Sequence, residues 1–131
     1  MVSTLFRINL PKRKTKYSAG YDFEAAEDVT INPGEVKLVP TGVKAKFPEY
    51  VVLKLYPRSS TAVKKRLMLA NNVGIIDSDY FDNPDNEGHI MFAFYNFGDD
   101  AYTIKKGEAI GQGIFELMTV FEEYDKKHTL N

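Results

Sequence analysis

Hydrophobic and polar residues alternate along most of this chain with the two-residue period of β-strands. The strongest such run is β-branched and aromatic and lies between Pro48 and Pro57. Gly, Pro, Asn and Asp separate the runs from one another, as is typical of turns. The strand-like runs are residues 5–10, 36–39, 50–56, 89–97 and 110–117. The pattern predicts an all-β fold of the sandwich or barrel type.

Some segments modify this prediction. Residues 59–66 break the strand pattern and are predicted to form one short helix, with Ser59 or Ser60 as its N-cap. Residues 92–97 are apolar on both faces, and strand-like character continues over residues 119–121. A β domain whose strands are buried on both sides often completes its core by associating with further copies. We therefore expect a homo-oligomer.

Composition narrows the classes of function. The 131 residues fit a single domain, residues 1–131, and 44% of them are hydrophobic, which suffices for a core. Seventeen Lys and Arg against eighteen Asp and Glu argue against a general nucleic-acid or membrane-surface binder, and the basic clusters at residues 12–16 and 64–66 are interpreted as solvated faces. The sequence has no cysteine, which excludes disulfides and thiolate sites, and two distant histidines, His89 and His128, argue against a His-rich metal cluster. Neither a signal peptide nor a membrane span is apparent, so we expect a soluble cytoplasmic protein.

The run Gly74-Ile75-Ile76 ends abruptly at Asp77 and is followed closely by Asp79 and Tyr80. We interpret the run as a buried strand that presents a partly desolvated Asp77 carboxylate at its exposed end, where it can deprotonate a water. If the strand continued, Asp79 would point the same way as Asp77. A turn at this place would remove that constraint on its direction. Tyr80 offers a flat ring that can stack on a sugar or base. A turn of capping residues is the alternative, and the segment alone leaves both interpretations open.

Three further places offer polar groups to a ligand. Arg58, Ser59 and Ser60 follow a strong strand and begin the predicted helix, whose N-terminus would add free N–H groups for an anion. A plain N-cap beside a surface Arg is the alternative. Gln112 is a single amide in a Gly-flanked strand, either aimed at a ligand oxygen or facing solvent. Asp22 follows a Gly-aromatic pair at a predicted strand start, which a turn entry alone would explain.

Four segments, in this order, resemble the first four motifs of the trimeric dUTPases. They are Ala19-Gly20-Tyr21-Asp22, Pro57-Arg58-Ser59-Ser60, Gly74-Ile75-Ile76-Asp77-Ser78-Asp79-Tyr80 and Gly107-Glu108-Ala109-Ile110-Gly111-Gln112. The resemblance implies a jelly-roll-like β-barrel or sandwich that assembles as a homotrimer with active sites between subunits. It also implies Mg²⁺-dependent hydrolysis of dUTP to dUMP and pyrophosphate, which limits uracil in DNA and supplies dUMP.

The same resemblance implies a role for each matching residue. Asp77 would activate the water that attacks the α-phosphorus, and Tyr80 would pack under the deoxyribose and leave no room for a 2′-hydroxyl. The phosphates would be held by Arg58, Ser59, Ser60 and Gln112. Uracil would be surrounded by Asn71 and by backbone groups of Ile75, Ile76 and Met91. Asp22 would lie near the waters of Mg²⁺ or near Arg58 without coordinating the metal, since Mg²⁺ keeps several waters and favours substrate phosphates.

The chain departs from the family pattern at two places, and two alternative functions follow. Residues 81–89 are longer, more acidic and richer in turn residues than the short turn usual there, and the family's fifth motif, a Gly-rich C-terminal arm, has no counterpart before Asn131. Residues 87–90 faintly resemble a segment of the dCTP deaminases, which share the fold but generally lack the Asp-Ser-Asp-Tyr run. The other alternative is a catalytically weak trimer that acts through protein–protein contacts, with the missing arm as its only support.

Overall fold

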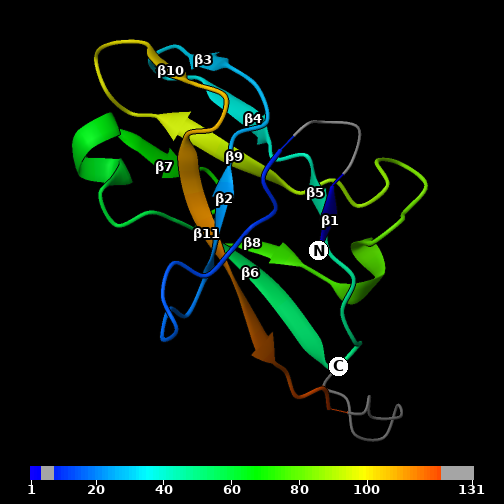
Figure 1. Cartoon of the computed structure of the whole chain (residues 1–131). Coiled ribbons are helices and arrows are strands. Elements are labelled where there is room, and N and C mark those ends of the chain that lie inside the picture. Colours follow the sequence, from blue (N-terminus) through cyan, green and yellow to red (C-terminus); the bar gives the residue numbers. More distant parts are fainter. Residues whose placement is uncertain (4–7, 122–131) are drawn as a thin grey trace, which may run out of the picture.

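Eleven strands and two short helical turns make up the part of the chain that the structure, a computed structural model, describes: residues 1–3 and 8–121 (Figure 1). The strands are β1 (Val2–Ser3), β2 (Tyr21–Glu24), β3 (Val29–Ile31), β4 (Val36–Pro40), β5 (Val43–Lys44), β6 (Val51–Pro57), β7 (Leu67–Leu69), β8 (Gly74–Ile76), β9 (Met91–Asn96), β10 (Tyr102–Ile104) and β11 (Ala109–Leu117). The turns are η1 (Thr61–Lys65), of π type, and η2 (Ser78–Tyr80), of 3₁₀ type. The predicted all-β fold is therefore confirmed.

Two larger antiparallel sheets enclose the core. One has the strand order β2-β11-β6-β8 and the other β4-β9-β7, while β1 pairs with β5 and β3 with β10. The long strand β11 crosses the molecule and joins β2 to β6 (Figure 1). The core between the sheets is built from Phe23, Leu53, Leu55, Phe92 and Phe94 with smaller aliphatic residues around them.

Strand β9 follows the predicted alternation. Phe92, Phe94 and Asn96 are buried, whereas the residues between them are half-buried on the outer face. The buried amide of Asn96 is fully used, because its Nδ2 donates to the carbonyls of Ile31 (2.8 Å) and Asp100 (2.9 Å) and its Oδ1 accepts the N–H of Gly98. The strand is therefore apolar on both faces, as predicted, but in one copy only the inner face is covered.

The outer face of the second sheet forms an apolar surface. Val36 and Leu38 of β4 are 53% and 60% exposed, and Met68 of β7 is also exposed. Val36 and Met68 both pair with Tyr95 of β9, and Leu38 pairs with Ala93, so these five side chains are neighbours. We refer to this surface as the outer apolar face.

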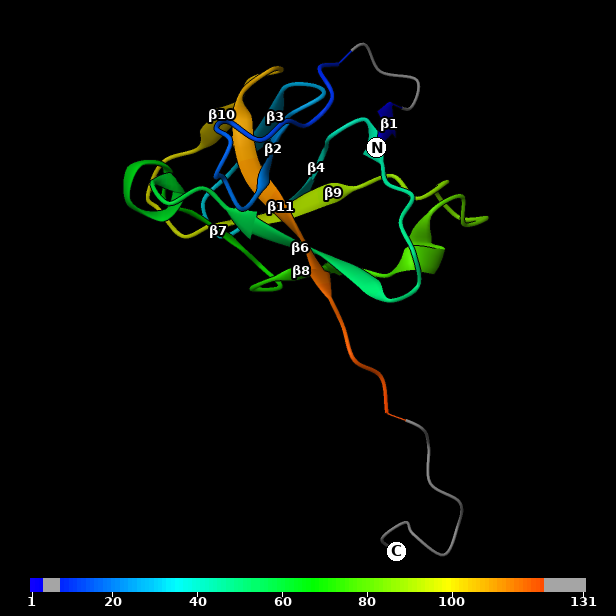
Figure 2. The same cartoon turned by 60° about the horizontal axis from the view of Figure 1, so that its bottom comes forward.

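Predictions for the ends of the chain differ from the structure. Leu10 is exposed and outside any described strand, and residues 5–7 of the first predicted run lie outside the described residues. Residues 119–121 do not extend the last strand but leave the sheets, as Figure 2 shows. The reason is that Leu117 pairs with Val51, the first residue of β6, so β11 has no partner strand beyond that point.

Candidate active site

Asp77 lies where the edge strand β8 ends and η2 begins. Within the described residues β8 pairs with β6 alone, and Ile76 lies opposite Leu53. The carboxylate of Asp77 is exposed and does not cap η2. Two expectations are wrong here: Ile75 is 55% exposed, so β8 is not a buried strand, and Asp77 is not desolvated in one copy. The cause is that no layer within residues 1–3 and 8–121 covers the outer side of β8.

The strand does not continue past Ile76, and η2 separates the polar groups that follow. Asp79 is exposed on this turn, so it does not share the direction of Asp77. Tyr80 packs against the edge of the core, and its hydroxyl donates to the carbonyl of His89 (2.7 Å) and accepts from Asn86 Nδ2 (2.8 Å). Asp77 is therefore open to solvent, whereas Tyr80 is anchored.

Arg58, Ser59 and Ser60 form the turn that joins β6 to η1. Arg58 and Ser59 are exposed, and none of the three side chains bonds to another described residue. Ser60 occupies the N-cap position without a side-chain cap, and η1 ends after five residues at Arg66, whose backbone is left-handed (φ 56°). The predicted helix is thus shorter than expected, and its dipole adds little for an anion. The three side chains, and not a helix dipole, are therefore what this turn offers to an anion.

Gln112 lies in the middle of a row of outward-facing polar residues. Within β11 it pairs with Asp22 of β2 on one side and with Tyr56 of β6 on the other. Its side chain covers Gly20, where an added Cβ would lie 2.5 Å from Gln112 Oε1. The glycine of the first motif therefore allows the amide to lie against the backbone. Pro57 pairs with the neighbouring Gly111, so Arg58 begins at the same end of the sheet.

Asn71 and Met91 lie near each other on the other sheet. The N–H of Ala70 donates to the carbonyl of Ala93 (2.8 Å), which holds Asn71 beside β9. Met91 precedes Ala93 by two residues and shares its face of the strand. The outer edge of β8, close by in sequence, carries backbone groups that no described strand uses.

The candidate residues fall into two groups at opposite ends of β6. Asp77 directly follows Ile76, which pairs with Leu53 near the start of β6. Arg58 directly follows Pro57, the last residue of β6. Asp77 therefore lies level with Val52, and the six residue steps along the extended strand from Val52 to Arg58 correspond to roughly 20 Å. The helical turns η1 and η2, which adjoin the two groups, accordingly lie on opposite sides of the molecule in both views (Figures 1 and 2).

We name these groups by their central residue. The arginine half consists of Asp22, Arg58, Ser59, Ser60 and Gln112. The aspartate half consists of Asn71, Ile75, Ile76, Asp77, Tyr80 and Met91. One copy of the chain does not bring the halves together.

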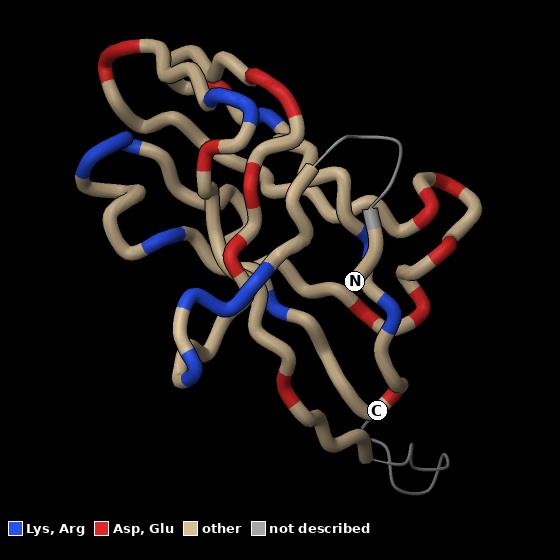
Figure 3. Tube along the Cα trace, viewed as in Figure 1, with Lys and Arg blue, Asp and Glu red and all other residues tan. Residues whose placement is uncertain are grey.

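Charge differs between the two halves. The basic loops at residues 12–16 and 64–66 lie on the side of the arginine half, and the acidic loop at residues 82–87 lies beside the aspartate half (Figure 3). The side of the arginine half therefore attracts anions more strongly than the side of the aspartate half does.

Sequence reasoning missed a cluster that fixes η1. Lys65 Nζ lies 2.6 Å from Glu108 Oε2, and the hydroxyl of Tyr102 donates to the same oxygen (2.9 Å). Burial followed by the hydrogen bond and charge of Glu108 raises the pKa of Tyr102 to about 12. Burial acts to raise the pKa of Glu108, but hydrogen bonds from Lys65, the Lys105 backbone and Tyr102 lower it overall. The pair is 43 residues apart in sequence, so no local signal marks it.

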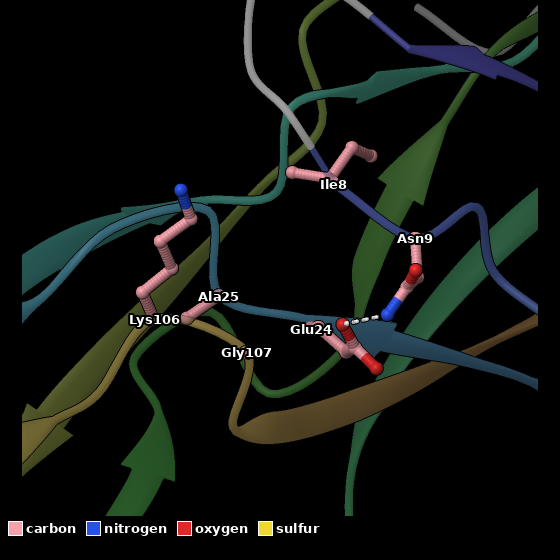
Figure 4. Close-up of a pocket in the computed structure, with 6 residues that line it drawn as sticks. All are labelled: Ile8, Asn9, Glu24, Ala25, Lys106 and Gly107. Atoms are coloured by element: carbon pink, nitrogen blue, oxygen red, sulfur yellow. Dashed lines mark hydrogen bonds between the residues drawn. The ribbon is translucent and has the colours of Figure 1, made fainter.

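A surface pocket of about 500 Å³ lies beside the end of β2, between residues 8–9 and the turn before β11 (Figure 4). Ile8 and Asn9 cover one side, and the turn at Lys106 covers the other; Asn9 Nδ2 donates to Glu24 Oε1 at 3.4 Å. The pocket contains none of the predicted site residues. In the described part of the chain no group of three acidic or histidine side chains is placed to hold a metal ion, and no described helix is long and apolar enough to cross a membrane.

Comparison with known proteins gives consistent matches. A protein-family model described as dUTPase matches residues 7–131. The deoxyuridine 5′-triphosphate nucleotidohydrolase of Lactococcus lactis subsp. lactis (strain IL1403) is 56% identical over 108 residues, which are 82% of this chain and 72% of that protein.

Solved structures agree with the sequence matches. The crystal structure of the dUTPase from Streptococcus mutans has a TM-score of 0.85 at 46% identity, covering 87% of this chain and 89% of that one. The dUTPase of phage phi11 of S. aureus, in a structure that describes the coordination of a structural Mg(II) ion, has a TM-score of 0.78 at 22% identity, covering 90% of this chain and 89% of that one. The second likeness concerns the fold alone. The expected jelly-roll-like β fold is confirmed.

Proposed function

Because the chain belongs to the dUTPase family, we propose that it hydrolyses dUTP to dUMP and pyrophosphate. The observation that carries this proposal is the 56% identity to the dUTP nucleotidohydrolase of L. lactis over 82% of the chain. The motif residues support it, because they provide a free carboxylate in one half and a cluster of phosphate-binding side chains in the other.

Asp77 acts as the general base. It removes a proton from the water whose oxygen bonds to the α-phosphorus, while the bond from that phosphorus to the bridging oxygen breaks and pyrophosphate leaves. The exposed carboxylate, which caps no backbone N–H, supports this role because both of its oxygens are available to a water.

The arginine half binds the phosphates. Arg58 supplies charge and a planar donor group, the hydroxyls of Ser59 and Ser60 donate hydrogen bonds, and Gln112 adds a neutral amide donor. These groups stabilise the charge that develops as pyrophosphate leaves. The side chains of Arg58, Ser59 and Ser60 bond to no other described residue, which supports this assignment because they are available to phosphate.

The aspartate half recognises the nucleoside. Asn71 and backbone groups of Ile75, Ile76 and Met91 surround the uracil, and the edge of β8 that no described strand pairs leaves such groups available. Tyr80 packs under the deoxyribose and excludes the 2′-hydroxyl of UTP. The anchored hydroxyl and the part-buried ring of Tyr80 support this role.

The arginine half would hold the Mg²⁺ that accompanies the substrate phosphates. Asp22 is the one carboxylate of the arginine half, a donor set that fits a metal bound mainly by phosphate oxygens and waters. When bound, the ion neutralises phosphate charge. Asp22 would interact with waters of the bound ion or orient Arg58, and Gln112 pairs with Asp22 on the neighbouring strand.

The active form is a homotrimer with each site shared between copies. The roughly 20 Å between Asp77 and Arg58 exceeds what one triphosphate-linked site accepts within a single copy. A head-to-tail ring brings the arginine half of one copy to the aspartate half of the next, and the opposite charges of the two sides favour that contact (Figure 3). The outer apolar face offers further surface for association.

An assay with dUTP, dCTP and Mg²⁺ tests the proposal. We expect pyrophosphate and dUMP from dUTP, and no ammonia from dCTP. Ammonia from dCTP without pyrophosphate from dUTP would instead identify a deaminase. Titration calorimetry covers the remaining alternative, because a trimer that binds no dUTP at high micromolar concentration would be a protein-binding scaffold.

A further inference from the structure

The loop at residues 81–89, which the proposed chemistry leaves unexplained, surrounds the hydroxyl of Tyr80. That hydroxyl donates to the carbonyl oxygen of His89 (2.7 Å) and accepts from Nδ2 of Asn86 (2.8 Å). Both hydrogen-bonding functions of the phenol are therefore used by this one loop. The ring is held at its far end as well as at its backbone.

The amide of Asn86 has a single possible orientation. Its Oδ1 accepts from the N–H of Gly88 (3.1 Å) and from Nδ2 of Asn83 (2.8 Å), so Nδ2 is the atom that faces Tyr80. Asn83 is fixed in the same way, because its Oδ1 accepts the N–H groups of Asp85 and Asn86 and its Nδ2 also donates to the Tyr80 carbonyl (2.7 Å). Two asparagine side chains thus form a small network around Tyr80.

The backbone of the loop is shaped for this network. Asp82 and Glu87 have left-handed backbones (φ 56° and 64°), and the N–H of Asp82 donates to the carbonyl of Glu87 (2.9 Å). Gly88 has φ 90°, and a Cβ there would lie 2.7 Å from the Tyr80 carbonyl oxygen. Such conformations cost free energy and persist where the surroundings fix them. The far end is tied to the fold, because Nε2 of His89 accepts the N–H of Gly42 (2.9 Å).

We propose that Asn86 is a positioning residue that holds the Tyr80 ring in place against the sugar and so sets the preference for dUTP over UTP. The proposal rests on the proposed function, in which Tyr80 packs under the deoxyribose. A tyrosine ring that is free at its hydroxyl can rotate away to accommodate a 2′-hydroxyl. A ring held by Asn86 and by the His89 carbonyl cannot do so without breaking hydrogen bonds.

The test uses variants that separate the anchor from the shape of the loop. Asn86→Asp keeps an oxygen for Asn83 and Gly88 but has no N–H for Tyr80. Tyr80→Phe keeps the ring and removes both bonds of the hydroxyl. Asp85→Asn is the matched control in the same loop, because the Asp85 carboxylate has no partner among the described residues.

The measurement is kcat/KM for dUTP and for UTP with each full-length variant. We expect the ratio of dUTP to UTP to fall by roughly 3- to 10-fold in Asn86→Asp and in Tyr80→Phe, the factor that corresponds to one neutral hydrogen bond in a part-exposed place. In the double variant the ratio of dUTP to UTP should fall no further than in Tyr80→Phe alone, because both changes remove the same contact. Asp85→Asn should keep the wild-type ratio.

An unchanged ratio in Asn86→Asp or in Tyr80→Phe would overturn the positioning role, as would additive losses in the double variant. If Asn86→Asp does not fold, the ratio measured in Tyr80→Phe tests whether the hydroxyl anchor matters, because the phenyl ring retains the packing of Tyr80. Failure of this inference is distinct from failure of the proposed function: wild-type protein that does not hydrolyse dUTP would reject the function itself.

Discussion

Asp77 follows the last residue of β8 at the N-cap position of η2, where its exposed side chain makes no capping hydrogen bond. Asp77→Asn preserves the size of the side chain and removes its ability to accept a proton. We expect kcat for dUTP to fall by about 100-fold or more, while the dissociation constant for dUTP changes little. Steady-state kinetics and titration calorimetry measure the two quantities.

The neighbouring Asp79→Asn serves as the control for Asp77→Asn, because Asp79 is equally exposed and lies on η2. It should keep most of the wild-type kcat. Loss of dUTP binding in parallel with kcat in Asp77→Asn would mean that Asp77 supports the structure of the site and not proton transfer.

Gly20 limits where Gln112 can place its amide. In Gly20→Ala the new Cβ would lie 2.5 Å from Gln112 Oε1, so the amide must move. We expect KM for dUTP to rise by about 10-fold with a smaller change in kcat, since the amide contributes mainly to phosphate binding. The same kinetic assay on Gln112→Ala should give a similar loss, and Gly20→Ala should add little to it. A Gly20→Ala variant with wild-type KM would contradict the assigned place of Gln112.

At the scale of single residues, the sequence identified side chains by their position after strong strands. Arg58 follows β6 and Gln112 lies within β11, two strands whose pattern was clear, whereas Asp77 follows the short apolar run of β8. Asn86 and Asn83 could not be found in this way, because their roles depend on loop conformation and not on periodicity. The exposure of Asp77 was also missed, since the apolar run before it gave no sign that β8 lies at a sheet edge.

At the scale of elements, η1 is held to β11 by a charged cluster. Glu108 has a lowered pKa, so its ionised form stabilises the fold; this stability is present above pH 4.5 and is lost as the pH falls through the lower folded-state pKa. The pKa of Tyr102 is raised, so the stability contributed by its neutral phenol is complete below pH 10 and is lost as the pH rises towards about 12.

Glu108→Gln tests this cluster. Both side chains of the Lys65 pair are about one fifth exposed, so we expect a loss of about 1–2 kcal/mol in the free energy of unfolding at neutral pH, between the values for exposed and buried pairs. The loss should shrink as the pH falls below 4.5 and vanish below the lower folded-state pKa, where the wild-type carboxylate is also protonated. Urea unfolding at fixed protein concentration measures it. Equal destabilisation at acidic and neutral pH would show that packing, and not charge, holds η1. Lys37 and Glu35 form a more exposed pair, and Glu35→Gln should cost less.

Long elements were predictable and short ones were not. β4, β6, β9 and β11 each span five residues or more, enough for alternation to be recognised. Strands of two or three residues, such as β5 and β10, show less than two periods and arise from pairing with distant partners. Residues 59–66 were predicted as one helix, but the left-handed backbone of Arg66 and the start of β7 at Leu67 restrict η1 to one turn.

At the scale of the whole molecule, the two halves of the site lie too far apart to act within one copy. Mixing two inactive variants tests whether copies complete each other. Asp77→Asn lacks the base and Arg58→Ala lacks the phosphate donor. In randomly mixed head-to-tail rings, about one quarter of the sites receive both intact halves. We expect co-refolded variants to regain about that share of wild-type activity.

Separately folded preparations of the two variants, mixed without exchange of subunits, provide the control and should stay inactive. Activity that does not return after co-refolding would place Asp77 and Arg58 in one copy and would require a different arrangement from the one described. Analytical ultracentrifugation confirms that the mixed species has the size of the wild-type assembly.

The order of strands within the sheets was beyond sequence reasoning. β11 lies between β2 and β6, and β9 lies between β4 and β7, so most neighbours are distant in sequence. Alternation identifies which face of a strand is buried but not which strand lies beside it. The sequence did indicate an uncovered apolar surface, because residues 92–97 were apolar on both faces, and the outer apolar face is where this appears.

The free edge of β8 also has a consequence for how the chain reaches its assembled state. A strand edge that no described strand pairs, next to an exposed Ile75, is a template to which another extended chain can add. If the proposed ring is the assembled state, a newly folded single copy faces two competing outcomes, closure into the ring or edge-to-edge aggregation. Light scattering during refolding should show more aggregate for an interface-disrupting variant such as Leu38→Asp than for Ile75→Lys, which places a charge beside the edge itself.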